Sequence, residues 1–123
     1  MLTDAQALFF APLPRAFPLW AALEEKIIAF WPNTGISVKK TQISLACPHL
    51  FACVSLPRRK KDGNAIVVSV SLNHVLDSPR LYACAPIRPG LWTNHILVSS
   101  EKDIDDELMG WLDEALRAVR SEE

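Results

Sequence analysis

The feature that most constrains the fold is the strict alternation of side chains over residues 65–72. Large apolar residues occupy every second position, and small polar residues occupy two of the positions between them. Because successive side chains of a β-strand point to opposite faces, this segment predicts a strand with one face toward a core. The apolar face carries Ile66, Val68, Val70 and Leu72, and the other face carries Val67, Ser69 and Ser71.

Four further segments between residues 36 and 98 also have the composition of strands. They are rich in apolar and β-branched residues and are bounded by polar turns. Residues 58–64 form a polar turn with Asp62-Gly63 at its tip, which predicts an antiparallel hairpin between the strands on either side. Residues 73–82 are expected to be irregular. The four expected strands span residues 36–38, 42–45, 51–56 and 92–98.

Helical spacing precedes this strand region. Pro18 is suited to a first helical turn, and the pattern predicts a helix over residues 18–31 with its charged side chains, Glu24, Glu25 and Lys26, on the face away from the core. A short helix within residues 2–10, capped by Thr3 or Asp4, is expected before it. The apolar stripe of the longer helix consists of Trp20, Leu23, Ile27 and Trp31.

A second long helix is expected over residues 101–120. Ser100 is a good N-cap, and Asp103 stands three residues later, as in a capping box. Gly110 interrupts the apolar stripe of this helix. Because a glycine within a helix costs about 1 kcal/mol relative to alanine, we expect Gly110 to allow a close approach to the sheet.

These elements predict an α+β fold: a curved antiparallel sheet of about five strands, with the N- and C-terminal helices packed on one face. The chain of 123 residues has the size of one domain. We therefore expect a single domain over residues 1–123, with an N-terminal arm at 1–16.

Composition indicates a soluble, cytoplasmic protein. Half of the residues are apolar, yet no apolar run approaches the length of a membrane span, and the first residues lack the basic region of a secretory leader. Cys47, Cys53 and Cys84 are odd in number and lie among apolar residues, which favours free thiols in a reducing compartment. No membrane partner is expected.

Charge is distributed unevenly although the net charge is only −1. Residues 36–98 contain eight basic and two acidic residues, a charge of +6, while the remainder contains five basic and twelve acidic residues, a charge of −7. The densest basic run, residues 58–61, fits an anion-contacting loop or a solvated turn that protects a sheet edge. Nucleic acid is not an expected partner, because only Phe51 lies near this run to stack on bases.

The sequence offers no recognisable catalytic centre, metal site or cofactor site. The acidic cluster at 103–107 is explained by charges at a helix N-terminus. Cys47, His49 and Cys53 do not have the spacing of a zinc site, and no nucleophile motif or glycine-rich phosphate loop is present. His95 is interpreted as a structural histidine more readily than as a catalytic one.

Three stretches together resemble the bacterial family called domain of unknown function 5655. Residues 38–44 read VKKTQIS, residues 66–72 read IVVSVSL before LDSPR at 76–80, and residues 92–96 read WTNHI before DIDDELMGWL at 103–112. The resemblance covers residues 17–118 and implies a small bacterial domain without an established activity. The cysteines lie outside the pattern. The polar positions that match it are Lys40, Thr41, Ser44, Ser69, Arg80, Trp92 and His95.

With both helices on one face, the opposite face of the sheet is the expected place for a site. Hydrogen-bond donors without carboxylates suit a small anionic ligand or an acidic partner surface, so a non-enzymatic binding module is the first hypothesis. A homodimer formed through a sheet edge or through residues 2–13 is an alternative, and an enzyme that uses His95 is another. The candidate ligand-binding residues are Lys40, Arg58, Ser69, Ser71, Arg80 and His95.

Overall fold

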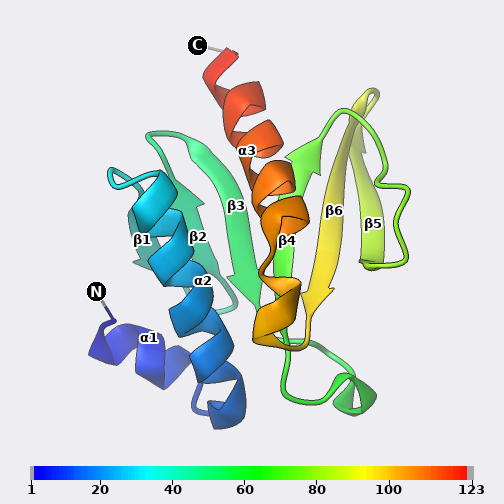
Figure 1. Cartoon of the computed structure of the whole chain (residues 1–123). Coiled ribbons are helices and arrows are strands. Elements are labelled where there is room, and N and C mark those ends of the chain that lie inside the picture. Colours follow the sequence, from blue (N-terminus) through cyan, green and yellow to red (C-terminus); the bar gives the residue numbers. More distant parts are fainter. Residues whose placement is uncertain (1, 122–123) are drawn as a thin grey trace.

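A six-stranded antiparallel sheet with two long helices on one face forms the body of the computed structural model, which describes residues 2–121 (Figure 1). The expected α+β class and antiparallel sheet are confirmed. The helices are α1 (Asp4–Phe9), α2 (Phe17–Phe30) and α3 (Asp106–Ser121). The strands are β1 (Gly35–Val38), β2 (Ile43–Ala46), β3 (Leu50–Ser55), β4 (Ile66–Leu72), β5 (Leu81–Arg88) and β6 (Leu91–Val98).

The strands are ordered β1-β2-β3-β4-β6-β5, and all neighbours are antiparallel. The expected hairpin across residues 58–64 is confirmed by the pairing of β3 with β4. The sequence prediction omitted β5, an edge strand that contains Pro86 and is mostly exposed. A proline is tolerated there because an edge strand has one side without a hydrogen-bonding neighbour. The Pro89-Gly90 turn, with Gly90 at φ 81°, was the signal for this hairpin.

The core lies between the sheet and the helices. Ile66, Val68, Val70 and Leu72 of β4 are buried against the helical layer, as the alternation predicts. The apolar stripe of α2 is also buried, with Trp31 partly buried beyond its end. Glu24 departs from the prediction: it was expected on the solvent face, but only 5% of it is exposed.

The N-terminal segment packs against the body of the domain. Thr3 caps α1 by accepting a hydrogen bond from the Gln6 backbone N–H, and the Gln6 side chain accepts one from the Trp20 indole at 3.0 Å. Phe10 is buried, whereas Leu8 is 75% exposed. The segment is therefore anchored, and a homodimer through residues 2–13 stays a prediction that a molecular mass in solution would test.

The start of the C-terminal helix differs from the prediction. Ser100 and Asp103 form a capping box, but it caps a 3-10 turn at Glu101–Asp103, and α3 begins only at Asp106. Gly110 is exposed, and a Cβ placed on it would meet nothing within 4 Å. The expected close approach to the sheet is therefore wrong. Within residues 2–121, no helix is long and apolar enough to cross a membrane.

Candidate functional site

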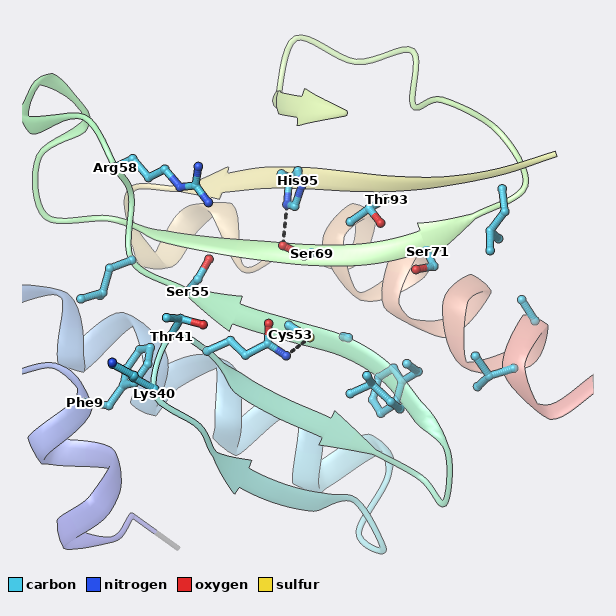
Figure 2. A pocket seen from close by; sticks show the side chains of 18 of the residues that line it. Phe9, Lys40, Thr41, Cys53, Ser55, Arg58, Ser69, Ser71, Thr93 and His95 are labelled. Atoms are coloured by element: carbon cyan, nitrogen blue, oxygen red, sulfur yellow. Dashed lines mark hydrogen bonds between the residues drawn. The ribbon is translucent and has the colours of Figure 1, made fainter. Parts of the chain in front are cut away.

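A pocket of about 790 Å³ lies over the face of the sheet turned away from α2 (Figure 2). It is bordered by β3, β4 and β6, by residues 40–42 before β2, and by Arg58 after β3; Phe9 and Pro12 line it from the N-terminal segment, and Ala118 and Val119 from the end of α3. No aspartate or glutamate of the described residues is among its lining side chains. We call it the basic pocket, after Lys40, Arg58, Arg88 and His95, which line it with Ser69 and Ser71.

The strand register explains why polar side chains gather at the floor of the pocket. Ser69 on β4 lies between Cys53 on β3 and His95 on β6, and Ser71 lies opposite Thr93. All of them point away from the helical layer because they alternate with buried core residues on their strands. Sequence reasoning thus placed Ser69, Ser71 and His95 on one face, and the structure brings these three together.

Among the described residues, Ser69 and His95 form the only hydrogen bond between side chains of β4 and β6 on this floor. Ser69 Oγ lies 2.7 Å from His95 Nδ1. Burial, and after it the positive charge of Arg58, lower the pKa of His95 below its ordinary value of 6.5. The imidazole is therefore neutral near pH 7 in the empty pocket, with one ring nitrogen able to accept and the other able to donate.

Arg58 stands on the loop between β3 and β4, and contacts of its neighbour hold this loop in place. Arg59 Nε donates to Asp62 Oδ2 at 3.1 Å, and the Arg59 guanidinium lies 4.5 Å from the centre of the Tyr82 ring. The Tyr82 hydroxyl donates to Asp62 at 2.8 Å. Burial alone would raise the pKa of Asp62, but the hydrogen bonds from Tyr82 and Arg59 outweigh it and lower this pKa. The loop is thus fastened to β5, with Arg58 directed toward the pocket (Figure 2).

Lys40 lies in the turn between β1 and β2, which the Lys39 N–H closes by donating to the Gln42 carbonyl at 2.8 Å. The Gln42 amide donates to Ser44 Oγ and to Cys53 Sγ, both at 3.1 Å. Within residues 2–121, neither Lys40 nor Arg58 forms an ion pair. Two cations without carboxylate partners therefore face a cavity that already contains the donors Ser69 and His95.

Arg80 does not belong to this group. Its guanidinium donates to Asp105 at 2.9 Å and to Glu107 at 2.9 Å, and it lies 5.3 Å from the Trp111 ring. These partners belong to α3 and to the segment before it, so Arg80 ties the 73–80 loop to the helical layer. The structure therefore places Arg80 outside the basic pocket and apart from the other candidate residues, because it engages an acidic cluster that is distant in sequence.

Several lining residues were missed by sequence reasoning. Ser55 and Thr93 lie two positions from Cys53 and His95, so the strand alternation itself could have placed them. Thr41 and Gln42 stand beside Lys40 in the same turn. Arg88 could not be placed because β5 was not recognised. Arg88 also interacts with another group of the chain.

The cysteines and the acidic cluster have structural surroundings that can be described residue by residue. Among residues 2–121, no group of three or more His, Cys, Asp or Glu side chains is arranged to hold a metal ion. Burial raises the pKa of Cys53, and the hydrogen bond with Ser44 offsets this only in part, so its thiol is protonated at neutral pH. In the acidic cluster, Asp103 accepts from the Ser99 and Ser100 N–H groups and Asp105 from that of Leu108. These carboxylates act as caps.

Comparison with known proteins identifies the family. The model of the family described as Domain of unknown function (DUF5655) matches residues 7–117, so the chain belongs to this family. No curated protein and no solved structure matches the chain. The family match begins within α1, ten residues earlier than the core of 17–118 that the sequence motifs suggested.

Proposed function

We propose that this DUF5655 domain is a non-enzymatic binding module whose basic pocket holds a small anionic ligand. The observation that carries the proposal is that Lys40 and Arg58 line the pocket without an ion pair, and that the described residues contribute no carboxylate to its lining. An anion would supply the counter-charge that the described residues do not give to Lys40 and Arg58, and hydrogen bonds to charged groups are the stronger ones.

The polar floor supports the same assignment. With His95 neutral, the hydrogen-bonded pair offers one donor to a ligand oxygen, either Ser69 Oγ–H or His95 Nε2–H according to the tautomer; with His95 protonated, both groups can donate. The pocket volume of about 790 Å³ lies in the range of small-molecule sites. A small ligand is favoured over an acidic protein surface because these donors lie inside a hollow, where a ligand can be enclosed.

Thermal unfolding of the full chain with a panel of anions at constant ionic strength tests this function. Phosphate, sulfate, acetate, octanoate and nucleotides would be compared with chloride. A ligand present at a hundredfold excess over its Kd stabilises the folded state by about 2.7 kcal/mol, which raises Tm measurably. We expect a rise with at least one anion and a smaller rise in Arg58→Ala. A Tm that no anion changes would contradict the proposal.

One observation favours a second candidate, an enzyme that uses His95. A neutral histidine hydrogen-bonded to a serine hydroxyl is the arrangement that activates a serine nucleophile. The test is incubation with a fluorophosphonate, followed by mass measurement of the intact chain. The binding module predicts no adduct, whereas an adduct that forms on the native chain and not on Ser69→Ala would establish the enzyme.

A further inference from the structure

The two ends of the basic pocket differ in chemistry. Lys40 and Arg58 lie at one end. Lys40 shortly precedes β2 and Arg58 shortly follows β3, and the pairing of Ile43 with Val54 brings the start of β2 beside the end of β3. Thr41 and Ser55 add hydroxyl groups there (Figure 2). This end offers positive charge and hydrogen-bond donors, with the apolar ring of Phe9 beside Lys40.

The opposite end is mainly apolar. Leu50 begins β3 and Leu91 begins β6, and the register places both at the end of β4 that lies farthest from Arg58. Leu50 is 52% exposed, which makes it one of the few large apolar side chains of the described residues with an open surface. Ala118 and Val119 of α3 extend this surface. Arg88 is the one basic residue at this end, and it has a partner within the chain.

The length of β3 separates the two ends. From Ser55 to Leu50 the strand advances five residues, which at about 3.3 Å per residue is roughly 17 Å. Ser69, Cys53 and His95 lie between them on the pocket floor. A ligand that uses both ends must therefore be elongated.

We propose that the ligand is an amphiphilic organic anion, with its carboxylate or other acidic group at Lys40 and Arg58 and its apolar body extending toward Leu50. This inference rests on the proposed function and adds the class of ligand. A bare inorganic anion would leave the apolar end unused in a cavity of about 790 Å³. Phe51 is only 3% exposed and offers no open ring face on which a base could stack.

Binding of a homologous carboxylate series to the full chain, measured by isothermal titration calorimetry, tests the ligand class. The probes are acetate, butyrate, hexanoate and octanoate, with octanol as the uncharged counterpart of octanoate. Burial of one methylene is worth about 0.8 kcal/mol, which corresponds to about a fourfold gain in affinity. We expect affinity to rise with chain length by up to this factor per methylene, and octanol to bind more weakly than octanoate.

Two leucine variants locate the apolar end. Leu50→Ser should reduce the gain in affinity per methylene, because it removes apolar surface from the pocket. Leu8→Ser is the matched control, since Leu8 is also exposed but does not line the pocket. Thermal unfolding of both variants verifies that they fold. An unchanged chain-length dependence in Leu50→Ser, or an equal loss in Leu8→Ser, would overturn the assignment of the apolar end.

The outcomes separate this inference from the proposed function. If acetate and octanoate bind equally and Arg58→Ala weakens both, the anion site stands and the amphiphilic ligand is overturned. If octanol binds as tightly as octanoate, or if no member of the series and no inorganic anion binds, the anion site itself fails and the inference fails with it.

Discussion

Ser69 Oγ lies 2.7 Å from His95 Nδ1 on the floor of a pocket that also holds Arg58. The bond joins two residues that are paired across adjacent antiparallel strands. It fixes the ring of the one titratable floor residue whose charge changes near neutral pH. The protonation of His95 should therefore report on what occupies the pocket.

Anion binding should depend on pH through His95. Burial and the charge of Arg58 lower the pKa of His95 in the empty pocket. A bound anion offsets both effects and raises this pKa, so binding takes up a proton. Affinity should increase as pH falls from about 7 through the range below 6.5, by at most tenfold per pH unit for one proton. Calorimetry at several pH values measures how the affinity changes with pH. The same dependence on pH in His95→Gln would contradict a role for His95.

The same group should influence the stability of the empty domain. Because the pKa of folded His95 lies below that of the unfolded chain, its contribution to stability is fully present above pH 6.5 and is lost as pH falls through the lowered pKa. Chemical unfolding of the native chain should thus show a decrease in stability below pH 6.5 that is smaller in His95→Gln. A decrease of the same size in the variant would assign it to other groups.

Arg58 and Lys40 should each contribute directly to anion affinity. Truncation of Arg58 or Lys40 to alanine removes a charge-assisted hydrogen bond worth about 1.5–3 kcal/mol, or roughly a tenfold to hundredfold rise in Kd. The stability of both variants should be nearly unchanged, because both side chains are exposed. Lys60→Ala and Lys39→Ala are matched controls, since both are exposed bases that do not line the pocket. Equal losses in variants and controls would indicate a diffuse charge effect.

Most of the fold could be predicted from the sequence, because the patterns that indicate its helices and strands are local. Strict alternation in β4 and the Asp62-Gly63 turn were enough for the central hairpin. Of the two predicted caps of the first helix, Thr3 or Asp4, Thr3 is the one observed, while Ser100 caps the 3-10 turn before α3 and not α3 itself. The strand that was missed, β5, lies in an equally local hairpin. Pro86 concealed an edge strand, whose existence depends on its pairing with β6.

Only some residues of the candidate site could be placed from the sequence. Ser69, Ser71 and His95 follow from strand alternation alone. Lys40 and Arg58 follow from basic turns at the strand ends and from the sorting of charge along the chain. Arg80 lies outside the pocket, and only the folded structure shows that Asp105 and Glu107 pair with it. A basic residue cannot be assigned to a pocket from sequence until its nearest carboxylates are known.

Arg80 should matter for stability and not for anion binding. Arg80→Ala removes the ion pairs to Asp105 and Glu107 and the contact with Trp111, and should lower the free energy of unfolding by about 1 kcal/mol because the carboxylates are partly exposed. Burial raises the pKa of Asp105, but the Leu108 N–H and Arg80 outweigh it and lower this pKa. The stabilisation is therefore present above about pH 3.8 and is lost as pH falls through the lowered pKa.

Urea unfolding at neutral and acidic pH measures this effect, and calorimetry checks that the affinity for the anion is unchanged. Arg117→Ala is a suitable control, because Arg117 is a mostly exposed base whose ion pair with Asp113 lies within α3. A loss of anion affinity in Arg80→Ala without a loss of stability would return Arg80 to the binding site.

Gly110 should be replaceable with a gain in stability. It lies inside α3, is exposed, and leaves open space where a Cβ would be placed. Alanine at this position should stabilise the domain by about 0.5–1 kcal/mol through its higher helix propensity. Thermal unfolding of Gly110→Ala should show a Tm higher by a few degrees. A lower Tm would contradict the expectation and show that a side chain at position 110 is unfavourable in the folded domain.

The most direct test of the binding account is an NMR titration of the isotope-labelled 123-residue chain with phosphate and with octanoate. The account predicts that at least one of them shifts the resonances of Lys40, Arg58, Ser69 and His95 while those around Arg80 and Asp105 stay in place. Shifts confined to the helical side, or a spectrum that neither anion changes, would contradict it.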